Sequence, residues 1–146
     1  MGFRNNGWKV LKNEHYLFHY RGKKILITGL IYTYAARISS DKLRELMSSA
    51  PSADLKIVLV HQPSEEVIAL ARENGYHILL AGHTHGGQIV LKPLGFPINM
   101  ARFEHQYYRG HHQIGKLNLI ITNGIGLSVI PLRFRAPAEF TEIRLN

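Results

Sequence analysis

The sequence predicts an α/β fold, with a buried β-α-β-α-β core followed by a β-rich C-terminal segment. Two unbroken apolar runs, KIVLV at 56–60 and HILLA at 77–81, are typical of strands that are covered on both faces. Segments with helical apolar spacing and helix caps alternate with such runs, which indicates a mainly parallel sheet. The chain has 146 residues, 45% apolar and 19% charged, so we expect a single domain over 1–146.

The N-terminal part predicts strands first and then a helix. Short strands are expected over 9–11 and 15–20, and the run KILITG at 24–29 predicts the first buried strand. A helix is expected over 40–49, because Ser39 or Ser40 offers a cap and apolar residues share one face.

The second helix is expected over 64–74, with Ser64 as its N-cap and Asn74-Gly75 at its end. From Gly87 onward the pattern changes to strands and loops only. We expect a loop rich in proline and glycine through Asn99, and strands over 88–91, 116–122 and 139–145.

Composition favours anionic partners and excludes cysteine chemistry. Lys and Arg number 18 against 10 Asp and Glu, which gives a formal charge of +8. Such a surface attracts phosphate groups on nucleic acids, lipids or small substrates. No cysteine is present, so disulfides, thiolate metal sites and cysteine nucleophiles are excluded. We find no signal peptide or membrane span in the sequence, and expect a cytoplasmic or membrane-peripheral location.

Three histidines follow the two buried runs. His61 comes directly after KIVLV, and His83 and His85 lie in GHTHGGQ after HILLA. Ligand sites of open α/β sheets lie at the carboxyl ends of the strands, so these loops converge if their strands are neighbours. In an extended chain the rings of His83 and His85 would project to the same side. A lone histidine is more often structural, but this combination predicts a metal site, and neutral imidazole suits Zn, Fe, Mn or Ni.

Other polar features have two interpretations. Arg133 and Arg135 are placed to clasp a phosphate or to form a structured loop with Arg stacked on Phe134, and we favour the structured loop. Asn123-Gly124-Ile125-Gly126 (NGIG) is typical of a loop where a backbone approaches closely. His111-His112 is expected in a polar turn as a solvated pair.

Four segments of the chain carry a family resemblance: HQP, ILLAGHTHGGQI, NGIG and PLRFRAPAEFTEI. Together they resemble the C-terminal half of the calcineurin-like metallophosphoesterases, with YkuE/YaeI-like phosphodiesterases as the nearest subgroup. The resemblance implies an αββα sandwich with a two-metal centre of Mn, Fe or Zn that hydrolyses phosphoesters. It implies that His61 and His83 bind one metal and that His85 binds the other. Gln88, Asn123, Arg133 and Arg135 are expected to support the site or to contact substrate.

Three further motifs of the family do not occur in the sequence: Asp-x-His, Gly-Asp and Gly-Asn-His. We therefore identify no catalytic residue in this chain, and we read it as the C-terminal part of a phosphoesterase domain. Two divalent cations repel each other strongly unless anionic ligands are shared between them. Three neutral imidazoles supply no such charge, so we expect at most one metal, weakly held.

Two functional hypotheses remain. The first is the C-terminal portion of a metal-dependent phosphoesterase, acting on a small-molecule or lipid phosphoester and completed by a missing N-terminal half, with weak or no activity alone. The alternative is a non-catalytic basic module that binds phosphate groups, anionic membrane or nucleic acid, although no specific nucleic-acid motif is found. Half a sandwich leaves sheet surface uncovered, so self-association is also expected.

Overall fold

Six strands form one mixed sheet in the computed structural model, which describes residues 6–91, 101–102 and 105–145. The strand order is β1-β2-β3-β4-β6-β5. The four inner strands are parallel to one another, whereas β1 and β5 pair antiparallel at the two edges. The strands are β1 (Glu14–Tyr20), β2 (Lys23–Leu30), β3 (Leu55–Val60), β4 (Ile78–Ala81), β5 (Gly110–Ile114) and β6 (Leu117–Ile121). The predicted α/β fold and its β-α-β-α-β core are thus confirmed.

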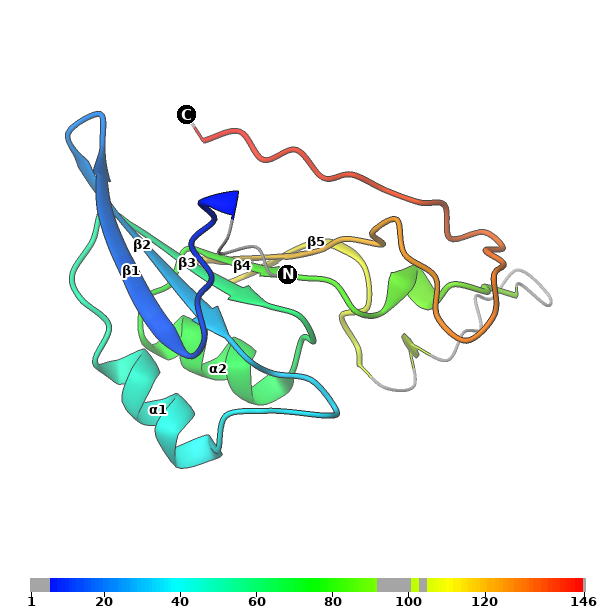
Figure 1. Ribbon diagram of the computed structural model, residues 1–146, viewed down its shortest axis with the longest axis horizontal. Coiled ribbons are helices and arrows are strands. Elements are labelled where there is room, and N and C mark those ends of the chain that lie inside the picture. Colours follow the sequence, from blue (N-terminus) through cyan, green and yellow to red (C-terminus); the bar gives the residue numbers. More distant parts are fainter. Residues whose placement is uncertain (1–5, 92–100, 103–104, 146) are drawn as a thin grey trace.

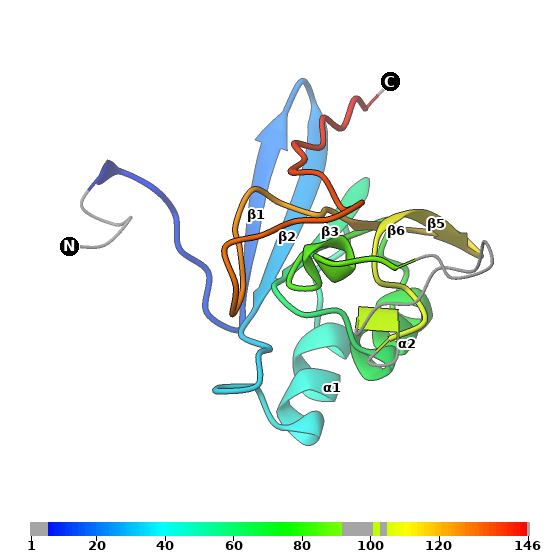
Figure 2. The same cartoon turned by 90° about the vertical axis from the view of Figure 1, so that its right-hand side faces the viewer.

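Two helices, α1 (Ser40–Ser48) and α2 (Glu65–Glu73), lie on the same face of the sheet (Figures 1 and 2). The Ser64 hydroxyl accepts a hydrogen bond from the Val67 N–H at 3.2 Å, as a helix N-cap does. Gly75 follows the end of α2 with a φ of +68°, a conformation that favours glycine. Ser39 precedes α1 without a hydrogen bond from its side chain, so only its backbone carbonyl caps that helix.

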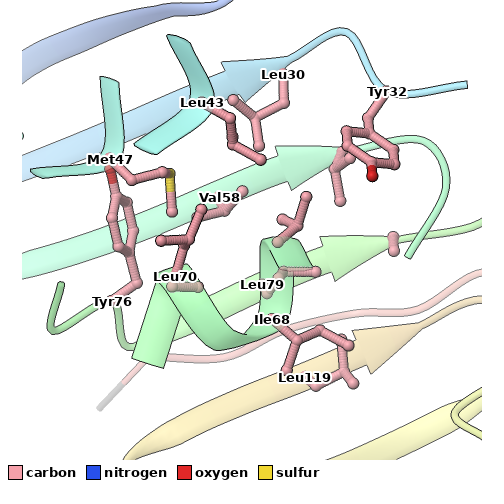
Figure 3. Close-up of a cluster of buried hydrophobic side chains, with 14 of the residues drawn as sticks. Leu30, Tyr32, Leu43, Met47, Val58, Ile68, Leu70, Tyr76, Leu79 and Leu119 are labelled. Atoms are coloured by element: carbon pink, nitrogen blue, oxygen red, sulfur yellow. The ribbon is translucent and has the colours of Figure 1, made fainter. Parts of the chain in front are cut away.

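The hydrophobic core lies between the helices and the sheet (Figure 3). Leu43 and Met47 of α1 belong to one buried cluster with Leu79 and Leu119 of the central strands, and all four side chains are fully buried. Full burial of a side chain of this size contributes roughly 1.5–3 kcal/mol. The apolar faces of the two helices therefore fix them on the sheet, and with them the loops at the carboxyl ends of the strands.

Three polar side chains within this core are linked by hydrogen bonds. His15 Nδ1 lies 2.8 Å from the hydroxyl of Thr28, which lies 2.7 Å from the hydroxyl of Tyr76, and His15 Nε2 contacts the Leu46 carbonyl oxygen at 2.9 Å. Burial lowers the pKa of His15, although the Leu46 carbonyl acts in the opposite direction, and burial raises the pKa of Tyr76. His15 and Tyr76 are therefore held neutral, and their hydrogen bonds satisfy a buried polar region.

The opposite face of the sheet carries no helix among the described residues. Side chains alternate along a strand, so Ile27, Leu59 and Leu80 point away from the helices. They line a shallow groove of about 600 Å³ that reaches His61. The C-terminal residues 139–143 run over the neighbouring part of this face (Figure 1). The partly uncovered sheet agrees with half of a sandwich, and self-association stays a prediction.

Three predicted strands are wrong. Residues 9–11 and 139–145 form no strand, and in 88–91 only isolated bridges occur, one of them between Ile89 and Phe134. Apolar alternation alone does not make a strand, because the segment also needs a free neighbouring edge for its ladder of hydrogen bonds. The loop expected through Asn99 lies largely outside the described residues.

One strand escaped prediction. His111 and His112 lie in β5, paired with Ile120 and Leu119 of β6, and not in a turn. The turn lies further on, at Gly115, which has a φ of +65°. His111 is exposed, as expected of a solvated side chain, whereas His112 is half-buried. Within the described residues, no helix combines the length and the apolar content that crossing a membrane requires.

Candidate functional site

The two loops that carry histidines meet at the carboxyl ends of β3 and β4. These strands are parallel neighbours, with Leu59 opposite Leu80, so the residues that follow them lie side by side. His83 Nδ1 lies 3.2 Å from His61 Nε2, and the two rings meet edge to face with centroids 5.0 Å apart. The predicted convergence of His61 and His83 is confirmed, and we call these two residues the histidine pair.

The GHTHGGQ loop is tightly wound and not extended. His83, His85 and Gln88 have φ values of 70°, 50° and 45°, and Gly86 and Gly87 between them are also in the left-handed region. Thr84 is right-handed, and His85–Gly87 form one turn of 3-10 helix. The predicted extended conformation, with the rings of His83 and His85 on one side of the chain, is therefore wrong. Left-handed conformations cost non-glycine residues energy, and they concentrate at functional sites.

His85 does not join the histidine pair in a group that could hold one metal ion. Its ring packs against Gly126, where an added Cβ would lie 3.4 Å from the His85 Cε1 atom. Burial, and then the charge of Arg133, lower the pKa of His85, although the Gly126 backbone acts in the opposite direction. The charge of His61 also lowers this pKa, as the smallest of the causes. The neutral imidazole is therefore favoured. Within the part of the chain that the structure describes, no three His, Asp or Glu side chains are grouped closely enough to hold one metal ion.

Arg133 fastens the histidine loop to the segment that follows β6. Its Nη1 donates to the carbonyl oxygens of His85 and Ala136 at 3.0 and 2.9 Å. Its Nη2 donates to the carbonyl oxygens of Asn123, Gly124 and Gly126 at 2.9, 3.1 and 2.6 Å. The two terminal nitrogens thus serve the protein's own backbone, which supports the structural interpretation of Arg133 over a phosphate clasp.

Gln88 and Asn123 make further connections between the same two segments. Gln88 Nε2 donates to the carbonyl oxygens of Ser128 and Ile130, and Gln88 Oε1 accepts from the Ser128 N–H. Asn123 Nδ2 donates to the Pro137 carbonyl oxygen at 3.3 Å, and its Oδ1 is buried against Gly86 at the place where a Cβ would stand. Both side chains therefore connect the GHTHGGQ loop to the segment that follows β6.

Arg135 has a different environment from Arg133. Its guanidinium lies over the Phe134 ring, 5.1 Å from the centroid, and the side chain is exposed. The predicted stacking of arginine on Phe134 is thus found at Arg135.

A further residue, Tyr34, was missed by sequence reasoning. It lies in the loop after β2, and its ring meets the His83 ring with centroids 5.1 Å apart. The signal was available, because β2 is the third parallel strand whose carboxyl end lies at this edge of the sheet.

The histidine pair has the spacing of two ligands of one cation. Zinc binds imidazole nitrogens at about 2.0–2.1 Å in a tetrahedral arrangement, which places two such nitrogens roughly 3.3 Å apart. The observed separation between His83 Nδ1 and His61 Nε2 is 3.2 Å. In the structure the two rings are hydrogen-bonded to each other, and the distance between their nitrogens is also that of two ligands of one divalent cation. The described residues supply no carboxylate that would join them in a metal-binding group.

Comparisons with known proteins give several relatives. The chain is 29% identical over 143 residues to the uncharacterized protein YpbG of Bacillus subtilis (strain 168), covering 94% of this chain and 48% of YpbG. It is 37% identical over 92 residues to the uncharacterized metallophosphoesterase YkuE of the same organism, covering 62% of this chain and 30% of YkuE. It is 33% identical over 91 residues to the phosphodiesterase YaeI of Escherichia coli (strain K12), covering 62% of this chain and 32% of YaeI.

These matches confirm the resemblance seen in the motifs: the chain is a relative of proteins named metallophosphoesterase. It spans about half the length of YpbG and about a third of YkuE and YaeI. No family model matches it.

Proposed function

We propose that this chain contributes part of the active site of a metal-dependent phosphoesterase, with His61 and His83 as ligands of one divalent cation. The observation that carries the proposal is the 3.2 Å separation of their facing nitrogens at the carboxyl ends of two parallel strands. A cation bound there would act as a Lewis acid toward a phosphoryl oxygen. The printed names of YkuE and YaeI support this class of chemistry.

The surrounding residues prepare the loop for this role. Arg133, Gln88 and Asn123 fix a backbone that would otherwise relax from its left-handed conformations. Burial and then the Arg133 charge lower the pKa of His85 and so favour its neutral form, in which one ring nitrogen keeps a lone pair for a metal or a proton. The Tyr34 ring contacts the His83 ring edge to face.

The charge and the ligand types of the site also bear on its substrate and its metal. A formal charge of +8 favours an anionic substrate, and we propose a small-molecule or lipid phosphoester. Mn, Fe or Zn would serve as the cation, since imidazole nitrogen suits each of them. The site contains no bridging carboxylate among the described residues, so we propose that full activity requires acidic ligands from another segment or chain.

The experiment is hydrolysis of a nitrophenyl phosphodiester with added Mn²⁺. We expect slow turnover that is lost with EDTA and lost in His83→Ala, because one of the two ligands is removed. His19→Ala is the matched control, since His19 is an exposed histidine of β1, which lies two strands away from β3 in the sheet. Turnover that survives in His83→Ala would contradict the proposal.

The alternative is the non-catalytic basic module, which the charge of +8 favours. Binding of phosphate groups by charge alone weakens steeply as salt rises and does not respond to EDTA. A chain that binds phosphate compounds in a salt-sensitive way, without any response to EDTA and without binding a divalent cation, would therefore support the module and contradict the phosphoesterase.

A further inference from the structure

Residues 125–134 form an exposed loop, which we call the apolar loop. Six of its ten residues carry large apolar side chains that are 44–102% exposed, with Val129 the most exposed. No acidic residue occurs from Ile125 to Ala138. Exposed apolar side chains are ordinary singly, but a continuous group marks an interaction surface. The six are Ile125, Leu127, Val129, Ile130, Leu132 and Phe134.

Two polar side chains, Arg133 and Gln88, fix the backbone of the apolar loop by hydrogen bonds. Arg133 closes its base through the carbonyl oxygens of Asn123, Gly124 and Gly126. Gln88 holds its tip through the Ser128 N–H and the carbonyl oxygens of Ser128 and Ile130. Both polar side chains bond backbone groups, and the apolar side chains remain at the surface. The exposure is therefore a built feature of the loop.

The backbone of the apolar loop is strained at Val129. Val129 has a φ of +61°, an outlying conformation for a β-branched residue, and its side chain is completely exposed. Burial in the protein does not compensate for the strain. Gln88 fixes the residues on both sides of Val129 and so maintains it. Strain maintained in this way points to a use for the exposed side chain.

We propose that the apolar loop inserts into the surface of an anionic lipid membrane. A lipid interface accepts apolar side chains but penalises unsatisfied backbone groups, and the Ser128 N–H and the carbonyl oxygens of Ser128 and Ile130 at the loop tip are already bonded within the protein. The absence of acids, the exposed Arg135 at the base and the net charge of +8 are complementary to an anionic surface. This inference does not depend on the proposed phosphoesterase function.

The test is sedimentation of the chain with vesicles of phosphatidylcholine that contain 30% phosphatidylserine, roughly the anionic content of a charged leaflet. We expect binding of the unmodified chain and at least about a tenfold loss of affinity in Val129→Asp, because an inserted aliphatic side chain is lost and a charge is added. The control is Leu145→Asp, which makes the same kind of change at an exposed leucine near the C-terminus, away from the apolar loop (Figure 1). It should bind within about twofold of the unmodified chain.

A second measurement reports insertion directly. Val129→Trp in a Trp8→Phe background places the single tryptophan at the loop tip, and its emission should shift to the blue and be quenched by brominated lipid when vesicles are added. Equal vesicle binding by Val129→Asp and the unmodified chain would overturn the proposal, as would an unshifted tryptophan. Absence of vesicle binding, with a dimer that Val129→Asp converts to monomer, would also overturn it and assign the loop to a second copy of the chain.

Discussion

Replacing Arg133 with methionine tests whether one guanidinium holds the site together. The substitution keeps a long side chain and removes the donors to five carbonyl oxygens. The two terminal nitrogens carry four N–H groups, and a hydrogen bond from a charged donor contributes about 1.5–3 kcal/mol. Water can replace part of these bonds because Arg133 is only half-buried, so we expect a loss of about 3 kcal/mol in the free energy of unfolding. For a chain of this size that corresponds to a fall of roughly 10 °C in Tm.

The assay is urea unfolding together with thermal unfolding, and Arg135→Met is the matched control. Arg135 lies two residues away with the same charge, but it is exposed and stacks only on Phe134, so its loss should cost less than about 1 kcal/mol. Arg133→Lys should recover only a small part of the loss, because one ammonium cannot reach all five oxygens. Equal effects of Arg133→Met and Arg135→Met would refute the assignment of Arg133 as the residue that fastens the loop.

The remaining predictions concern the loop and the pH dependence of folding. Gly86→Ala should destabilise by about 2–4 kcal/mol, because Gly86 has a φ of +64° and its new Cβ would overlap Asn123 Oδ1. Asn123→Ala should recover part of that loss in the double variant, and strict additivity of the two losses would contradict the overlap. Because burial lowers the pKa of His15 below 6.5, its contribution to stability is present above pH 6.5 and is lost as pH falls through its folded pKa. Tm measured from pH 7.5 to 5 should therefore fall less in His15→Gln than in the unmodified chain, with His85 supplying a remaining slope of the same sign, and an equal fall would contradict this reasoning.

The sequence allows the central elements to be predicted because their signals are local. KIVLV and HILLA form β3 and β4 within a residue of the expected bounds, and the Ser64 cap forms as expected. Parallel pairing of these strands then brings His61 and His83 together. The convergence follows from topology alone, since the carboxyl ends of neighbouring parallel strands lie at one edge of the sheet.

The features that were not predicted depend on contacts between distant segments. Residues 139–145 have the composition of a strand, but they form no ladder with the sheet. His111 and His112 look like turn residues, yet pairing with β6 places them in β5. The left-handed conformation of His85 is stabilised by an arginine 48 residues away, which no local propensity reveals. Tyr34 reaches His83 because the parallel strands β2, β3 and β4 are neighbours and end at the same edge of the sheet.

The central claim is that His61 and His83 together hold one divalent cation. The most direct measurement is metal stoichiometry and affinity of the isolated chain by titration with Zn²⁺ and Mn²⁺, with His61→Ala and His83→Ala beside the His19→Ala control. We predict at most one ion per chain, abolished by either of the first two substitutions and retained in the control. No bound ion, two firmly bound ions, or one ion that survives both substitutions would contradict the claim.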